Sequence, residues 1–222
     1  MVSDLPLCRQ ATAVPAFVLT VLLKDCTLMS RADLWNRRYR DKADVAPELP
    51  VELQQPLALL PAGDTLDLAC GDGAASLYLA GRGHRVLSVD FAVEGLKRLQ
   101  RFTTAPAAGD ATGKCKPEIK TRQLDLSLPE ALTDLGRFDN IVLLRYLPEV
   151  SLLQQLPALM QPEARLLIKT FNTDYHRQTG FPERFCLQPG ALTAFSPDLT
   201  LIRYENGLSQ GSPYDSYLYV FK

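Results

Sequence analysis

The stretch from Thr65 to Ala92 reads TLDLACGDGAASLYLAGRGHRVLSVDFA. Its first five residues form an apolar run that predicts a strand, and a turn containing two glycines follows directly. The small and apolar residues AASLYLAGR then predict a helix, and RVLSVD predicts a second strand that ends at Asp90. A strand, a tight turn, a helix and a second strand in this order indicate a sheet of parallel strands.

The rest of the chain continues this alternation after a helical N-terminal part. Helices are expected over residues 31–42 and around residues 50–60, where Pro50 suits the start of a helical turn. The other expected elements are strands at 65–69, 85–90, 118–126, 138–147, 164–172, 199–207 and 216–222, helices at 74–82, 93–102, 150–160 and 190–195, and irregular connections at 103–117 and 173–189.

This order predicts an α/β fold with a Rossmann-like, doubly wound, seven-stranded sheet that ends in a C-terminal antiparallel hairpin. We assign residues 31–222 to one domain and residues 1–30 to an N-terminal extension that is disordered or lies upstream of the true start. The apolar run 11–23 is too short for a bilayer, which needs roughly 20 apolar residues. It also lacks a clean cleavage site for a secretion signal, and MSRADLWNRRY from Met29 resembles an ordinary cytosolic beginning.

The composition excludes several classes of partner. The chain has 222 residues, 46% of them hydrophobic, and a net charge of -1, so it buries a core without carrying the basic stripe that nucleic acid requires. Its five cysteines are scattered and form no C-x-x-C pair, which argues against a disulfide framework or a zinc site. We expect a cytoplasmic protein, a monomer or homodimer, with no metal, nucleic-acid or membrane partner.

The glycine turn and the end of the second strand indicate an adenosine-type cofactor. Gly71 and Gly73 let the backbone turn tightly and approach a ligand, while Asp90 ends the neighbouring strand where a carboxylate can bind ribose hydroxyls. A dinucleotide fingerprint needs a third glycine at the position of Ser76, and Asp72 would oppose a pyrophosphate within the turn. A cofactor with a sulfonium and an amino-acid end has less reason to avoid these carboxylates.

The sequence LDLACGDG resembles motif I of the class I S-adenosylmethionine-dependent methyltransferases, with Ala69 in place of the first glycine. The resemblance covers most of the domain, because VLSVDFA and TRQLDLS resemble the second and third motifs. It implies that Asp90 binds the ribose, that Phe91 lies beside the adenine, and that Asp125 lies near the adenine amino group with Leu126 next to it.

Within that superfamily the chain resembles the tellurite-resistance-type, TehB-like branch of small-molecule methyltransferases. LWNRRY is similar to its N-terminal W-D-x-R-Y element, which implies that Arg38 or Tyr39 approaches the methionine carboxylate of the cofactor. RYL, KTFN and RFCLQPGALTAF resemble its later elements. Pro148 stands where that branch has a histidine, so the resemblance assigns no role to that position.

Some candidate residues allow both a structural and a functional interpretation. Asp67 reads as an organiser of the turn, and Cys70 as a small apolar residue within it. Arg145 and Tyr146 follow the fourth strand on the side where an acceptor enters, so Arg145 binds an anion or forms a structural salt bridge.

Other residues carry a weaker signal. His176, with Tyr175 beside it, is a candidate base or an ordinary surface residue. Trp35 is expected in the core, and His84 lies on the side away from the binding edge.

These observations predict a methyltransferase that uses S-adenosylmethionine and acts on a small molecule such as a thiol, selenol or oxyanion. The lack of an obvious catalytic histidine or carboxylate pair fits an acceptor that is already nucleophilic. A non-catalytic S-adenosylmethionine-binding module and an NAD(P)-dependent oxidoreductase are the alternatives. Turnover on an acceptor panel would distinguish the first, and cofactor titration the second.

Overall fold

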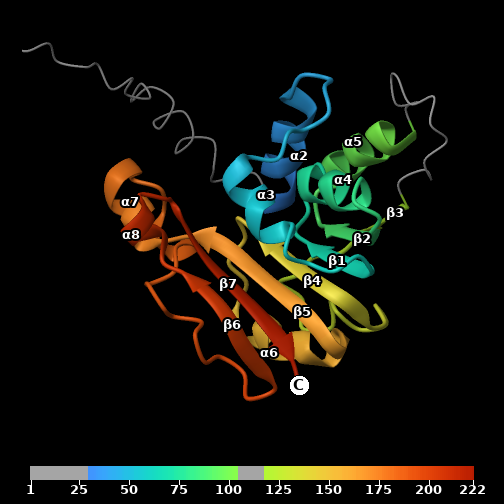
Figure 1. The fold of residues 1–222 in the computed structure, drawn as a ribbon. Coiled ribbons are helices and arrows are strands. Elements are labelled where there is room, and N and C mark those ends of the chain that lie inside the picture. The colour runs from blue at the N-terminus through green and yellow to red at the C-terminus, as the bar shows by residue number, and fades with distance from the viewer. Residues whose placement is uncertain (1–29, 105–117) are drawn as a thin grey trace, which may run out of the picture.

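A seven-stranded sheet forms the centre of the fold in the computed structural model, which describes residues 30–104 and 118–222 (Figure 1). The strand order is β3-β2-β1-β4-β5-β7-β6. The expected extension 1–29 and most of the connection 103–117 lie outside the described residues. The strands are β1 (Asp64–Leu68), β2 (Arg85–Asp90), β3 (Ile119–Gln123), β4 (Phe138–Leu144), β5 (Met160–Phe171), β6 (Leu199–Glu205) and β7 (Tyr214–Phe221).

The strand order reverses next to β1, which pairs in parallel with both β2 and β4. Leu66 of β1 lies opposite Leu87 on one side and Ile141 on the other. Leu66 and Ile141 are fully buried, as the near-continuous apolar sequences of central parallel strands predict. Ligands of open α/β sheets bind beyond the carboxyl ends of the strands at such a reversal, and the turn at 69–73 follows β1 there.

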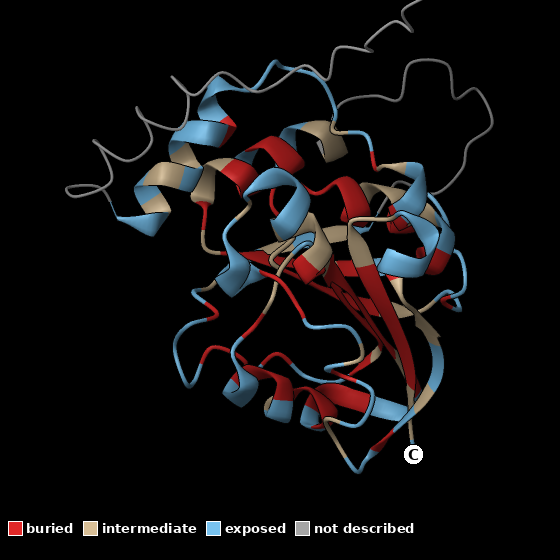
Figure 2. Ribbon diagram, turned by 90° about the vertical axis from the view of Figure 1, so that its left-hand side faces the viewer, coloured by how far each residue is buried: buried red, intermediate tan, exposed pale blue. Residues whose placement is uncertain are grey.

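Helices cover both faces of the sheet, as expected. In Figure 1, α2 to α5 lie on one side of the sheet and α6 on the other. Figure 2 shows that the central strands are largely buried, whereas the outer surfaces of the helices are exposed. The helices are α2 (Arg31–Asp41), α3 (Val51–Leu57), α4 (Ala74–Ala80), α5 (Val93–Thr104), α6 (Val150–Gln155), α7 (Thr173–Thr179) and α8 (Gly207–Gln210), with short 3-10 turns at Leu156–Leu159 and Glu183–Phe185.

The C-terminal strands form the expected antiparallel hairpin. β7 pairs antiparallel with β5 and with β6, so it lies between them in the sheet. β6 consequently runs in the same direction as β5, and both strands end at the edge where β1 and β4 end. The loop between β6 and β7 therefore lies at the ligand-binding edge of the sheet.

Three local expectations are wrong. Residues 173–179, expected to be irregular, form α7 because Asn172 caps its first turn and Gly180 ends it in a left-handed conformation. Residues 190–195, expected to be helical, form turns. Trp35, expected in the core, is 38% exposed because α2 buries a stripe occupied by Tyr39.

No helix within residues 30–104 and 118–222 is both long enough and apolar enough to cross a bilayer.

The packing of α3 against the sheet is tested by two Leu→Ala substitutions. Leu53 is fully buried, so Leu53→Ala is expected to lower the free energy of unfolding by about 2–5 kcal/mol, since it removes apolar contacts and leaves a cavity. Leu59→Ala is the control, because Leu59 is 46% exposed and its loss is expected to change the stability by less than about 0.5 kcal/mol. Urea denaturation measures both, and equal losses would contradict this packing of α3.

Candidate functional site

The turn after β1 depends on left-handed backbone conformations. Ala69, Gly71 and Gly73 have φ values of 58°, 62° and 85°. At Gly71 a β-carbon would also lie 2.5 Å from the Tyr39 hydroxyl oxygen, so any side chain there would displace Tyr39. Ala69 adopts the same left-handed region with a β-carbon, at a cost of roughly 1–2 kcal/mol.

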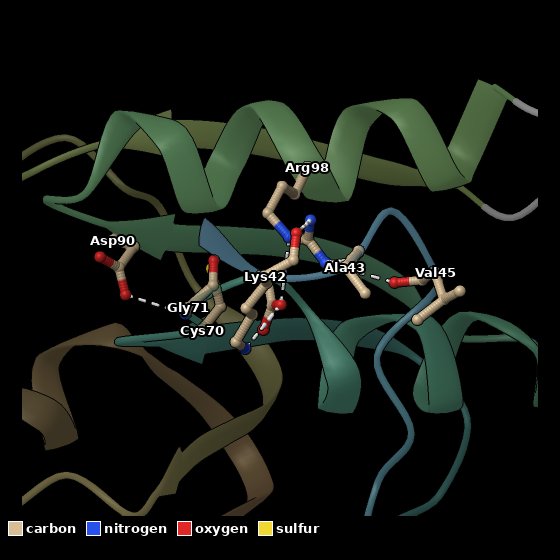
Figure 3. A network of polar contacts seen from close by, with 8 residues as sticks. Lys42, Ala43, Val45, Cys70, Gly71, Asp90 and Arg98 are labelled. Carbon is tan, nitrogen blue, oxygen red and sulfur yellow. Dashed lines mark hydrogen bonds and ion pairs between the residues drawn. The ribbon is translucent and has the colours of Figure 1, made fainter. Parts of the chain in front are cut away.

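Asp90 holds this turn from the neighbouring strand. Its Oδ2 accepts a hydrogen bond from Gly71 N at 2.8 Å (Figure 3). Its Oδ1 accepts one from Ala92 N at 2.8 Å. The side chain is buried, which raises the pKa of its carboxyl group. Each oxygen of a carboxylate has two lone pairs, so Asp90 keeps acceptor capacity for ligand hydroxyls beyond its backbone hydrogen bonds.

Asp67 lies beneath the turn rather than facing a ligand. It is 1% exposed, and its Oδ2 accepts a hydrogen bond from Ser76 Oγ at 2.5 Å. Ser76 Oγ accepts in turn from Ser88 Oγ at 2.8 Å, so one polar chain joins β1, α4 and β2. Burial raises the pKa of Asp67 to about 7. This geometry agrees with a role in organising the turn, and it explains the serine where a dinucleotide fold has glycine.

Asp72 is neutralised, which corrects the expectation that its charge would face a ligand in the turn. Its Oδ2 lies 2.8 Å from Lys42 Nζ and 3.4 Å from Arg98 Nε. The Arg98 guanidinium, from the buried face of α5, also donates hydrogen bonds to the carbonyl oxygens of Lys42, Ala43 and Val45 (Figure 3). Sequence patterns did not reveal this cluster, because its members are 26 to 56 residues apart.

The helix α2 lies against the glycine turn through Tyr39. This residue is 7% exposed, and burial, Asp90 and Asp72 raise the pKa of its hydroxyl. Arg38 instead lies on the exposed side of α2, where its guanidinium stacks on Trp35 at 4.8 Å from the ring centroid. Asn36 Oδ1 accepts a hydrogen bond from Glu94 N and so joins α2 to the start of α5. Of the two expected residues, Tyr39 therefore contacts the turn, whereas Arg38 contacts Trp35.

The expected adenine end lies beyond β2 and β3. Phe91 is half-buried, and the Arg31 guanidinium lies 5.6 Å from its ring centroid. Asp125 is exposed, and its Oδ1 accepts hydrogen bonds from both Ser127 N and Ser127 Oγ, which lower its pKa. Leu126, expected next to the adenine, is 8% exposed and packs in the main core.

Arg145 and Tyr146 follow β4, where the acceptor is expected to enter. Arg145 is exposed and has a φ of 55°, and its N donates a hydrogen bond to Lys169 O at 2.8 Å. Burial raises the pKa values of the Tyr39 and Tyr214 hydroxyls, and the Arg145 guanidinium opposes both shifts, so it lies near both rings. Tyr146 is half-buried, and burial raises the pKa of its hydroxyl.

His176 lies on α7, beyond the end of β5. Its Nδ1 lies 2.6 Å from Phe181 O, so a proton on Nδ1 donates to this carbonyl and leaves Nε2 as the acceptor. Phe171 of β5 stacks on Tyr175 at a centroid distance of 4.8 Å and packs at a tilt against Tyr214 at 5.1 Å. Aromatic rings therefore cover this part of the edge. Cys70 lies elsewhere, within the glycine turn, and burial raises the pKa of its thiol.

The described residues fit an adenosine cofactor with an amino-acid end. The side-chain-free turn at Gly71, the free lone pairs of Asp90 and the half-buried ring of Phe91 occupy one edge in the order that such a ligand requires. The Asp72 carboxylate is paired with Lys42 and Arg98, so it does not face this edge as an unpaired charge. Within residues 30–104 and 118–222, no three His, Cys, Asp or Glu side chains are grouped as a metal site would need.

Comparison with known proteins identifies relatives of this fold. Residues 35–134 match the family model described as tellurite resistance protein TehB. The structure of TehB from Haemophilus influenzae has a TM-score of 0.60 and 18% sequence identity, and the match covers 86% of this chain and 67% of that protein. No curated protein matches the chain by sequence.

Two further structures show the same fold over nearly their whole length. The CcbJ methyltransferase from Streptomyces caelestis has a TM-score of 0.60 at 14% identity, covering 82% of this chain and 94% of that one. Magnesium protoporphyrin IX methyltransferase from Synechocystis, with bound S-adenosylmethionine, has a TM-score of 0.58 at 15% identity, covering 96% and 100%. The expected class I methyltransferase fold is confirmed.

The strain at Ala69 predicts that Ala69→Gly stabilises the protein. Glycine removes the left-handed penalty of roughly 1–2 kcal/mol but adds roughly 0.5–1 kcal/mol of chain entropy to the unfolded state, so a net gain of up to about 1.5 kcal/mol is expected. Ala75→Gly, within α4, is the control and is expected to lose about 1 kcal/mol. Urea denaturation distinguishes them, and a loss in both variants would refute strain at Ala69.

The raised pKa of Asp67 predicts a pH-dependent loss of stability. The folded-state pKa of about 7 lies above the ordinary value of 3.8, so the contribution of Asp67 is complete below about pH 4 and is lost as the pH rises to about 7. Compared with Asp67→Asn, the wild-type protein is therefore expected to lose stability between about pH 4 and 7 and to stay level above that.

Denaturation of both proteins at about pH 4.5, 6, 7 and 8.5 measures the difference. Asp64→Asn serves as the control, because Arg85 lowers the pKa of Asp64 and keeps this carboxylate ionised over the whole range. If the difference between wild type and Asp67→Asn does not change with pH, the carboxyl group is not titrating as described.

Proposed function

We propose that this chain, an S-adenosylmethionine-dependent methyltransferase by its class I fold and its TehB family match over residues 35–134, transfers a methyl group to a small, already nucleophilic molecule. The acceptor atom is a thiol or selenol sulfur or selenium, or an oxyanion oxygen. The observation that carries the proposal is the junction of Gly71 and Asp90, where a side-chain-free turn meets a carboxylate with free lone pairs at the reversal of strand order.

Bound S-adenosylmethionine supplies an electrophilic methyl group on a sulfonium, and this group passes to the acceptor as the sulfonium–carbon bond breaks and S-adenosylhomocysteine remains. The chain's own task is to align the acceptor and to exclude water. Asp90 orients the ribose, Tyr39 covers the turn, and Arg145 and Tyr214 border the side from which the acceptor approaches. A thiol acceptor loses its proton to solvent as its thiolate forms.

The groups around this edge favour such an acceptor over one that needs a strong base. Among the described residues near it, Tyr39, Tyr146 and Tyr214 all have hydroxyl pKa values raised by burial, which weakens them as proton acceptors at neutral pH. His176 has one nitrogen occupied by Phe181 O. Positioning of a soft nucleophile requires no general base.

The related structures do not select one acceptor. Magnesium protoporphyrin IX methyltransferase and coclaurine N-methyltransferase have the same fold, but their names indicate very different acceptors. The acceptor must therefore be argued from this chain's own residues. A location in the cytoplasm and a monomeric or homodimeric state, without nucleic-acid or membrane partners, remain part of this proposal.

Cofactor titration tests the proposal. Calorimetry with S-adenosylmethionine, S-adenosylhomocysteine and NADH is expected to show micromolar binding of the first two only. Asp90→Asn is expected to weaken S-adenosylhomocysteine binding by about 10–100-fold, because a hydrogen bond to a charged group is lost. Asp198→Asn, at an exposed position away from the turn, is the control and is expected to bind normally.

Turnover distinguishes the remaining alternatives. Methyl transfer to any thiol, selenol or oxyanion in a radiolabel assay supports the enzyme, whereas cofactor binding without transfer across the panel supports a non-catalytic binding module. Binding of NADH without either adenosyl ligand would overturn the proposal.

A further inference from the structure

A cavity lies at the ligand-binding edge of the sheet, beside the end of β5. It has a volume of about 540 Å³ and lies between the start of α3, the ends of β5 and β6 and the segment after α8. Its polar lining consists of Glu52, Gln55, Lys169, Arg203, Glu205, Gln210 and Ser212. Because β5 and β6 both end here, the cavity is next to β4 and the expected methyl-transfer position.

Lys169 is the buried cation of this cavity. Its side chain is 7% exposed, and its Nζ donates no hydrogen bond to any residue within the ranges 30–104 and 118–222. The nearest carboxylate oxygen, Glu205 Oε2, is 3.8 Å away, which is an ion pair but too long for a hydrogen bond. Burial lowers the pKa of Lys169. The Lys169 ammonium group lines the cavity without a hydrogen-bond partner among these residues, so an anionic ligand group can bind it there.

The carboxylates of the cavity differ in how far they are already engaged. Glu205 Oε1 lies 2.8 Å from Arg203 Nε and 2.7 Å from Arg203 Nη2, a two-point ion pair. Glu52, in the first turn of α3, forms no ion pair within 4 Å among residues 30–104 and 118–222. Glu52 is therefore the carboxylate that can accept a cationic group of a ligand.

The charges of the lining select against a ligand of one sign. Lys169 and Arg203 balance Glu52 and Glu205, so an anion would meet two carboxylates and a cation would meet two positive groups. A molecule that carries both charges can place each beside its opposite.

A row of polar groups joins the cavity to the glycine turn. Burial raises the pKa of the Tyr214 hydroxyl, while Arg145 lowers it and Glu52 raises it further, so both charged groups lie near this ring. Arg145 also opposes the raised pKa of Tyr39, which lies against Gly71. The backbones of β4 and β5 also meet here, because Arg145 N donates to Lys169 O. A small molecule in the cavity therefore lies beside the side from which an acceptor approaches the cofactor.

We propose that this cavity binds the polar end of the methyl acceptor and that the acceptor is a small zwitterion, with its carboxylate on Lys169 and its ammonium group facing Glu52. The methyl-transfer part rests on the function proposed above, whereas the binding preference does not.

Four thiols of similar size test the proposal: L-cysteine (zwitterion), 3-mercaptopropionate (anion), cysteamine (cation) and 2-mercaptoethanol (neutral). Their binding is measured by calorimetry with saturating S-adenosylhomocysteine, which fills the cofactor site and prevents reaction. Cysteine is expected to bind at least about tenfold more tightly than the other three, because it makes both charged contacts. Equal binding of all four would overturn the proposal.

Variants assign the two contacts. Lys169→Met is expected to reduce cysteine binding to the level of cysteamine, and Lys169→Arg to retain part of it. Glu52→Gln, at an exposed and therefore tolerant position, is expected to reduce it to the level of 3-mercaptopropionate. Lys120→Met, on the exposed side of β3, is the control. Unchanged cysteine binding in both Glu52→Gln and a folded Lys169→Met would refute the site.

Methyl transfer from S-adenosylmethionine separates this inference from the proposed function. If all four thiols are methylated at equal kcat/KM, the proposed function is supported and the zwitterion site is refuted. If cysteine binds selectively but no thiol is methylated, the zwitterion site is supported and methyl transfer to a thiol is refuted.

Discussion

The structure around the turn depends on the neutralisation of one buried carboxylate. Asp72 is 7% exposed, and a carboxylate in such a place is unfavourable unless cations and hydrogen-bond donors surround it. Arg98 meets this need and also binds three carbonyl oxygens of the segment after α2. One guanidinium therefore joins α5, the turn and the C-terminal side of α2, which keeps Tyr39 against Gly71. An arginine suits this position because its five donors have fixed directions, whereas a lysine offers a single charged point.

The ligand-binding edge holds strained backbone at two neighbouring strands. Ala69 and Arg145 follow β1 and β4, which pair directly, and both have left-handed φ values without being glycine. Hydrogen bonds from the neighbouring strands fix both regions, since Cys70 N donates to Val89 O and Arg145 N donates to Lys169 O. Strain of this kind persists where the surroundings over-determine the backbone, and it concentrates at functional sites.

Local patterns predicted the parts of this structure that depend on neighbouring residues. The alternation of strands and helices, the turn at Gly71 and the place of Asp90 all follow from spacing along the chain. Trp35 was misjudged because composition favours burial of a lone tryptophan, whereas the polar helix α2 buries only a stripe held by Tyr39. The α7 caps, Asn172 and Gly180, were readable signals that the irregular composition of this segment obscured.

Contacts across long sequence separations escaped prediction. The Arg98 cluster and the cavity around Lys169 assemble side chains from elements that no local pattern connects. Lys169 in particular lies within an apolar strand, where its sequence neighbours suggest only a buried position. Lys169 and Glu52 line the same cavity only because α3 packs across the sheet at this point. This arrangement depends on tertiary packing and not on the spacing of residues along the chain.

The position of β7 between β5 and β6 has a consequence for the order in which the protein is made. A ribosome synthesises β6 before the strand that separates it from β5, so β6 has no native partner in the sheet at that moment. Until β7 is synthesised, the edge of β5 also stays open to pairing with other chains, as exposed strand edges do. The wall of the cavity that Glu205 supplies is therefore among the last parts of the binding edge to reach its final place.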